Sequence, residues 1–152
     1  MKLLTLIVVG KLRSEAFSKI EDEYFKRIKK IKYQVIEIKS LNGDKNAEAS
    51  LALKKIDSLK IKPDKIFAMT ERGLQLDSPT FSKLIFDYFE GGFAHLLFIM
   101  GGASGHGKKI LDRADQEISL SSLTFPHQMA RVIFIEQLYR AQCLHDGHPY
   151  HK

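Results

Sequence analysis

Apolar and polar residues follow one another in blocks whose periods alternate between those of strands and helices. Residues 3–9 are almost entirely apolar and rich in Ile and Val, which is typical of a strand covered on both faces. Residues 14–31 carry apolar side chains three or four positions apart, at Phe17, Ile20, Tyr24, Ile28 and Ile31. This spacing predicts a helix with one apolar stripe after the buried strand.

The alternation continues to the C-terminus. Further strands are predicted at residues 33–39, 65–70, 95–100 and 117–121, and further helices at residues 47–59, 78–90, 108–115 and 126–144. Ser78 and Pro79 predict the start of the third helix, with Ser78 as its N-cap. Gly91 and Gly92 predict its end. This order predicts an α/β fold with a mostly parallel sheet flanked by helices, in one domain over residues 1–152.

The last predicted helix differs from the others because its apolar residues point around most of its circumference. These residues are Met129, Val132, Ile133, Phe134, Ile135, Leu138, Tyr139 and Leu144. A helix that is apolar all round is buried on more than one side. The cover can come from the chain itself or from a second protomer, and the sequence leaves both alternatives open.

Charge indicates the kind of partner. The chain has 24 Lys and Arg against 18 Asp and Glu, a net charge of +6, and 44% hydrophobic residues, as expected for a globular domain. Residues 1–62 carry a net charge of +7 and the remainder −1. A basic surface of this kind favours an anionic partner, most commonly nucleic acid; a merely solvated lysine-rich surface is the alternative.

Several classes of protein are excluded. Cys143 is the only cysteine, so no intrachain disulfide forms, and no Cys/His cluster has the spacing of a zinc site. The apolar run at residues 3–9 stops at Gly10 and Lys11, too short to cross a bilayer and without a signal-peptide cleavage site. We therefore expect a cytoplasmic protein without a metal or a membrane partner.

A glycine cluster follows the predicted strand at residues 95–100. Residues 102–108 match the G-x-x-x-x-G-K pattern of a phosphate-binding loop, but Lys109 stands where Ser or Thr would hold Mg²⁺. Glycines after a parallel strand also allow a ligand to approach the backbone. We expect the ligand site where three loops converge, after Met69, from Gly101 onward and at residues 119–126.

Two segments carry candidate acid–base residues. Thr124, Pro126 and His127 lie at the predicted start of the last helix, with Thr124 as a candidate cap. The positive end of a helix favours a neutral imidazole at His127 that can accept a proton; an exposed histidine without a role is the alternative. The last five residues, 148–152, add two histidines, a tyrosine and a lysine after a predicted turn.

The chain resembles the SPOUT-class large-subunit rRNA pseudouridine N3-methyltransferases, the RlmH family, in three motifs. They are GGASG at 101–105, SLSSLTFPHQMARVIFIEQLYRA at 119–141 and HPYHK at 148–152, and the similarity extends to the opening MKLLTLIVVGK. The resemblance implies an α/β-knot fold with a C-terminal trefoil knot and a homodimer. It also implies S-adenosylmethionine-dependent methylation of N3 of a pseudouridine in 23S rRNA on the assembled ribosome.

The resemblance also assigns site residues. It implies that S-adenosylmethionine contacts Met69, Thr70, Gly102, Ser121, Ser122, Leu123, Thr124, Phe125 and Pro126. It implies that His127, Tyr150 and Lys152 act in catalysis and that Arg140 binds RNA. We favour His127 as the proton acceptor, with Tyr150 or a tail histidine as alternatives.

The substrate surface is expected from the domain itself, because no dedicated RNA-binding module is present. Lys26 and Lys30, in the basic first half, are the further candidate RNA contacts. The alternative function is a non-catalytic RNA- or nucleotide-binding module that uses the basic first half and the glycine-rich loop.

Overall fold

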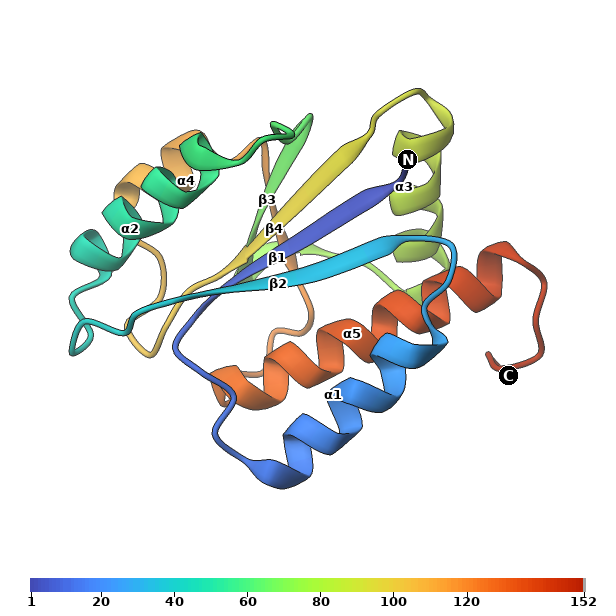
Figure 1. The fold of residues 1–152 in the computed structure, drawn as a ribbon, viewed down its shortest axis with the longest axis horizontal. Helices are drawn as coiled ribbons and strands as arrows, with labels where there is room; N and C mark the ends of the chain where they lie inside the picture. Colours follow the sequence, from blue (N-terminus) through green and yellow to red (C-terminus); the bar gives the residue numbers. More distant parts are fainter. Residues whose placement is uncertain (152) are drawn as a thin grey trace.

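Five parallel strands form the centre of the structure, a computed structural model that describes residues 1–151. The strands are β1 (Leu3–Val9), β2 (Lys32–Ile38), β3 (Lys65–Gln75), β4 (His95–Met100) and β5 (Gln116–Ser119). The helices are α1 (Glu15–Arg27), α2 (Lys45–Ser58), α3 (Ser78–Glu90), α4 (Lys108–Arg113) and α5 (His127–His145). The strands lie in the order β2-β1-β4-β3-β5, and every pair of neighbours is parallel (Figure 1). The predicted α/β class is therefore confirmed.

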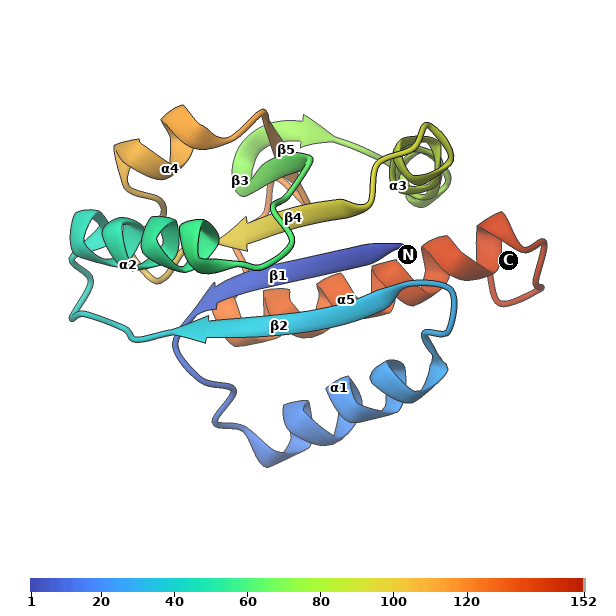
Figure 2. The same ribbon diagram turned by 45° about the horizontal axis from the view of Figure 1, so that its top comes forward.

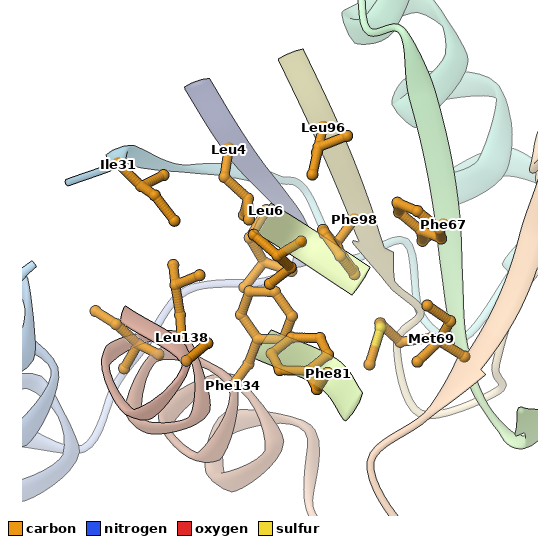
Figure 3. Packing of buried hydrophobic residues seen from close by; sticks show 14 of the residues in the cluster. Leu4, Leu6, Ile31, Phe67, Met69, Phe81, Leu96, Phe98, Phe134 and Leu138 are labelled. Carbon is orange, nitrogen blue, oxygen red and sulfur yellow. The ribbon is translucent and has the colours of Figure 1, made fainter. Parts of the chain in front are cut away.

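Helices cover both faces of the sheet. On one face α1, α3 and α5 pack on side chains of the central strands, including Leu4, Leu6 and Phe98, around Phe134 of α5 (Figure 3). On the other face α2 and α4 cover a second, smaller cluster that includes Ile7. Figure 2 shows α2 and α4 on the side of the sheet away from α1. Because β1 lies inside the sheet and between these two layers, all seven of its residues are buried, as its apolar run predicts.

Other parts of the same chain bury most of the apolar surface of α5. Phe134, Ile135 and Leu138 are buried against the sheet, α1 and α3, but Met129 keeps 39% of its surface exposed. Ile20 of α1 is 43% exposed. The chain thus accounts for the inner side of α5 and leaves apolar surface on both helices facing outward.

Two helix boundaries differ from the prediction for reasons that the structure shows. Helix α1 ends at Arg27, because Ile28 already has extended backbone, although Ile28 is buried as its spacing suggested. The N-cap of α3 is Asp77, whose carboxylate accepts the N–H of Thr80 at 2.8 Å. Ser78 instead donates its hydroxyl to Gln137 at 2.6 Å. Both Asp and Ser cap helices well, so their adjacency left the choice to the tertiary contact.

Strand β3 continues beyond its predicted end. Met69 pairs with Ile118 of β5, and after an irregularity Leu74 pairs with the same residue. Gly73 makes the close approach possible, because a Cβ on it would lie 2.6 Å from the backbone nitrogen of Ile118. Residues 70–73 therefore bulge out of the ladder at the carboxyl edge of the sheet.

The basic first half does not form one surface. Helix α1 and its lysines lie on one face of the sheet, while α2 and its lysines lie on the other. The charge excess of residues 1–62 is therefore divided between two sides of the molecule. Within residues 1–151, no helix is long and apolar enough to cross a membrane.

Candidate functional site

A cavity of about 590 Å³ opens at the carboxyl edge of the sheet. Three segments and the first turn of α5 surround it, which is the predicted convergence of loops. Its walls come from residues 69–72 of β3, from Met100 and residues 101–106 that follow it, and from residues 120–121 and 123–127 with Ala130, together with Lys45 and Leu111. Ligands in open parallel sheets bind at this edge.

The bulge in β3 supplies one wall. It carries Thr70, Glu71 and Arg72 out of the strand pairing and to the edge of the cavity. The hydroxyl oxygen of Thr70 is buried and has no hydrogen-bond partner among the described residues. A buried polar atom without a partner is costly, so this hydroxyl is available to a ligand in the cavity.

The glycine-rich loop supplies the second wall. A Cβ on Gly101 would lie 2.6 Å from the carbonyl carbon of Gly105, and one on Gly102 would lie 3.1 Å from Val9. The loop closes on itself through an isolated bridge between Gly102 and Gly105. The glycines thus let the backbone fold tightly and present its own groups to the cavity.

The glycine-rich loop does not form a phosphate-binding loop, although residues 102–108 match part of that sequence pattern. Lys108 does not line the cavity, and its ammonium group pairs with Asp112 on the next turn of α4 at 2.7 Å. Gly107 is packed against α2, where a Cβ would lie 2.7 Å from the carbonyl oxygen of Lys45. The lysine that would bind phosphates is therefore engaged elsewhere.

The segment between β5 and α5 forms the third wall. The hydroxyl of Ser119 donates to the carbonyl of Ser121 at 2.8 Å, and the hydroxyl of Ser121 accepts the N–H of Leu123 at 3.0 Å. These short-range bonds give the segment its shape and leave Leu123 69% exposed over the cavity. Thr124 is not a helix cap, since the N-cap residue is Pro126 and no side chain caps α5.

His127 is the first residue of α5, and its exposed side chain lines the cavity. The next residue fixes this turn, because the Gln128 side-chain oxygen accepts the N–H groups of Arg13 and Ser14 at 2.9 and 3.3 Å. One turn later, Arg131 is buried and paired with Glu21. His127 therefore stands on a firmly held helix end at the mouth of the cavity.

Most residues assigned to S-adenosylmethionine lie together. Met69, Thr70, Gly102, Ser121, Leu123, Thr124, Phe125 and Pro126 all line the cavity, whereas Ser122 does not. Tyr150 and Arg140 lie elsewhere: Arg140 is in the last part of α5, and Tyr150 follows the end of that helix. Arg140 is separated from His127 by about 20 Å of helix, at ~1.5 Å per residue.

Tyr150 belongs to a polar cluster around the end of α5. Its hydroxyl lies 3.2 Å from that of Tyr24 and donates to Glu136 at 3.3 Å, while Arg140 stacks over its ring at 4.9 Å. The hydrogen bond with Tyr24, then burial and the charge of Glu136, raise the pKa of Tyr150 well above its usual value of 10. In this arrangement Tyr150 is a hydrogen-bond donor and a poor proton acceptor.

The candidate RNA contacts lie near this cluster and are already paired. Lys26 lies 3.6 Å from Glu23, and Lys30 lies 3.8 Å from Asp146. Arg140 is held by Glu136 at 2.6 Å. Lys152 lies outside the described residues.

Sequence reasoning missed His106, Lys45 and Arg72, which also line the cavity. Nε2 of His106 donates to the carbonyl of Met69 at 2.8 Å, and burial lowers the pKa of this imidazole although the hydrogen bond opposes the shift. His106 thus ties the glycine-rich loop to β3. All three residues come after predicted strands. Their position at the carboxyl edge of the sheet was therefore the signal in the sequence that could have identified them as cavity residues. Among residues 1–151, no cluster of His, Cys, Asp or Glu is suited to a metal ion.

Comparison with known proteins gives a consistent result. A family model described as "Predicted SPOUT methyltransferase" matches residues 1–151. The ribosomal RNA large subunit methyltransferase H of Clostridioides difficile (strain 630) is 35% identical over 161 residues, covering 98% of this chain and 99% of that protein. The protein of the same name from Leuconostoc citreum (strain KM20) is 36% identical with the same coverage.

Solved structures share the fold at low identity. A probable methylase family protein from Haemophilus influenzae Rd KW20 has a TM-score of 0.58 at 9% identity, covering 98% of this chain and 70% of that one. TrmJ from Z. mobilis ZM4 has a TM-score of 0.54 at 10% identity, covering 93% of this chain and 70% of that one.

Proposed function

Because the chain belongs to the SPOUT methyltransferase family, we propose that it transfers a methyl group from S-adenosylmethionine to large-subunit ribosomal RNA. The cavity at the carboxyl edge carries this proposal, because it gathers three loops, a glycine-lined wall and His127 around one space. We propose that residues 1–152 act as one methyltransferase domain in the cytoplasm, where its ribosomal substrate is found. The trefoil knot that the family resemblance implies stays a prediction.

The cavity fits the methyl donor in its chemistry. Apolar side chains of Met69, Leu123 and Phe125 offer contacts for an adenine ring, and the unpartnered hydroxyl of Thr70 offers a hydrogen bond. The loop at Gly102 brings backbone close to a ligand. Ser121, Ser122, Thr124 and Pro126 complete the proposed set, with Ser122 acting through its neighbours. When bound, S-adenosylmethionine supplies a methyl group on a positively charged sulfur.

We propose N3 of a pseudouridine in 23S rRNA, on the assembled ribosome, as the methyl acceptor. N3 carries a proton that must leave when the new N–C bond forms. His127 stands at the mouth of the cavity and has no hydrogen-bond partner among the described residues, so its imidazole is free to accept that proton. The chain's other task is to hold acceptor and donor in line for the displacement.

We further propose that the protein acts as a homodimer. Within one chain, Arg140 lies about 20 Å of helix away from His127, so Tyr150 and Arg140 cannot join the cavity of their own chain. A second copy packed on the outward apolar surface of α1 and α5, which includes Ile20 and Met129, would bring its tail toward this cavity. Tyr150 would then donate a hydrogen bond, and Lys152 and Arg140 would hold RNA phosphates.

A transfer assay tests the proposed activity. The protein is incubated with methyl-labelled S-adenosylmethionine and ribosomes purified from cells that lack it, and the modified nucleotide is located by mass spectrometry. We expect label at one pseudouridine of the large-subunit RNA. Calorimetry should also detect binding of S-adenosylmethionine and no binding of ATP. Binding of ATP or of RNA without any methyl transfer would instead favour a non-catalytic binding module.

A further inference from the structure

Three basic side chains from separate segments of the chain lie in the wall of the cavity or of the small pocket beside it. Lys45 and Arg72 line the cavity itself. Lys11 lines a small adjacent pocket that shares Gly101 and His127 with it. All three side chains are exposed. Lys45 comes after β2, Arg72 lies in the bulge of β3, and Lys11 comes after β1. The mouth of the cavity therefore receives positive charge from three separate segments.

These three cations are free of ion pairs, in contrast to the RNA contacts predicted from the sequence. Among residues 1–151, no carboxylate lies within ion-pair distance of Lys11, Lys45 or Arg72. Of the described residues that line the cavity, Glu71 is the only one with an acidic side chain. A cation without a partner binds a phosphate without first giving up an existing ion pair. The mouth is thus better prepared for a polyanion than the paired lysines at the end of α1.

The turn that carries Lys11 is held on both sides. Gly10 has a φ of 85°, and its N–H donates to Ile38 at 2.8 Å. The N–H of Leu12 donates to Glu37 at 3.2 Å, and that of Arg13 donates to Gln128 at 2.9 Å. The base of the Lys11 side chain is therefore fixed beside the first turn of α5.

The other two cations also stand on fixed backbone. Lys45 is the first residue of α2, directly after Asp44, which caps the helix by accepting the N–H of Ala47 at 3.1 Å. Arg72 precedes Gly73, which is pressed against β5. Because the backbone at both positions is already fixed, only the long side chains themselves become ordered when they bind a phosphate.

We propose that Lys11, Lys45 and Arg72 bind backbone phosphates of the RNA strand on either side of the nucleotide whose base enters the cavity. The inference rests on the proposed function and deepens it. A base that undergoes chemistry in a pocket must leave its stack, while its flanking phosphates stay outside. Contacts to those phosphates set position and orientation without reading sequence. This arrangement places the contacts within reach of the acceptor base.

The test compares two triple variants with equal loss of charge. K11A/K45A/R72A removes the three cations of the mouth. K54A/K55A/K60A is the matched control, because these exposed lysines lie at or beyond the far end of α2, about 13 Å or more along the helix axis from Lys45. Melting temperatures of both variants confirm that they fold. K11R/K45R/R72K, which keeps the charges, is the rescue variant.

Methyl transfer is measured with labelled S-adenosylmethionine and unmodified ribosomes over a series of salt concentrations. For K11A/K45A/R72A we expect KM for ribosomes to rise at least tenfold. The slope of log kcat/KM against log salt should decrease by about 2, at ~0.7 for each phosphate that the variant no longer neutralises. The control and the rescue variant should stay near wild type, and calorimetry should give the same affinity for S-adenosylmethionine in all four proteins.

Each outcome separates the inference from the proposed function. Unchanged KM and salt slope in K11A/K45A/R72A, with an active wild type, would overturn the inference alone. An equal loss in the control would show that only net charge matters, and weaker binding of S-adenosylmethionine would assign the cations to the cofactor; either result overturns it. If the wild type transfers no methyl group, the proposed function fails, and filter binding of ribosomes still decides whether the mouth variant has lower affinity than the control.

Discussion

Arg131 and Glu21 form a two-pronged ion pair inside the protein. Nε and Nη2 of Arg131 donate to the two carboxylate oxygens of Glu21 at 2.6 and 2.8 Å, and both side chains are at most 10% exposed. The remaining nitrogen, Nη1, donates to Glu37 of β2 at 2.6 Å. One side chain therefore joins α5 to α1 and β2, close to His127.

Replacing Arg131 with Ala should destabilise the protein by about 3–5 kcal/mol, because Glu21 would remain buried without a partner. Urea unfolding measures this change. Lys19→Ala is the control, since its pair with Glu15 is exposed, and its loss should cost less than about 1 kcal/mol. Equal, small effects of the two substitutions would contradict a structural role for the buried pair.

Glu37 should make stability depend on pH. Burial alone would raise its pKa, but hydrogen bonds from Arg131 and the N–H of Leu12 hold it below the ordinary value of 4.5. The unfolded chain then takes up this proton at higher pH than the folded one, so the contribution is present above about pH 4.5 and is lost as pH falls through the folded pKa. The difference in unfolding free energy between wild type and Glu37→Gln should shrink below pH 4.5. A constant difference down to pH 2 would be inconsistent with this.

The sequence predicts the sheet well because its central strands are continuous apolar runs with clear ends. Leu3–Val9 stops at Gly10 and His95–Met100 stops at the glycine cluster, and both strands have these bounds in the structure. Boundaries decided by tertiary contacts were less predictable. Ile28 keeps the apolar spacing of α1 after the helix has ended, because burial and helix continuation are separate requirements.

The site was predictable in part for a similar reason. Loops that follow parallel strands meet at one edge, so their convergence follows from the order of elements. The bulge at residues 70–73 has no apolar signature, and neither Lys45 nor Arg72 belongs to a motif. The family motifs group Tyr150 with His127, but the intervening helix holds the two apart in one chain. A sequence motif does not show whether two of its residues act in the same copy of the chain or in different copies.

Gly101→Ala should weaken binding of S-adenosylmethionine at least tenfold in calorimetry. Its Cβ would lie 2.6 Å from the carbonyl carbon of Gly105, so the loop must move. Gly91→Ala is the matched control, because Gly91 ends α3 with a φ of −73° and precedes the start of β4, whereas the cavity lies at the other end of that strand. The control should keep wild-type affinity. Unchanged affinity in Gly101→Ala would show that this wall does not contact the cofactor.

His127→Ala should lower kcat for methyl transfer by about 10²-fold or more, the usual contribution of a general base. Affinity for S-adenosylmethionine should change less than about threefold, because in the proposed role the imidazole acts on the acceptor and not on the donor. His145→Ala is the control, because His145 stacks on Phe86 at the other end of α5. The His145→Ala variant should keep the turnover of the wild type. Normal turnover of His127→Ala from pH 6 to 8 would remove His127 from the role of base.

Two inactive chains should restore activity to each other if the tail works on the partner's cavity. One chain carries His127→Ala, and the other ends at Gly147 and so lacks Tyr150 and Lys152. In a mixed dimer one site combines both defects, while the other combines an intact cavity with an intact tail. With random pairing, half of the dimers are mixed, so about a quarter of all sites should be active.

The measurement compares co-expressed chains with the two chains purified separately. Activity near a quarter of wild type in the co-expressed sample, and close to none in either separate sample, supports a site shared between copies. Activity no higher than that of the separate chains would require Tyr150 to reach His127 within one chain, across about 20 Å of α5. Since Tyr150 is held at the far end of that helix by Tyr24 and Glu136, we expect restoration.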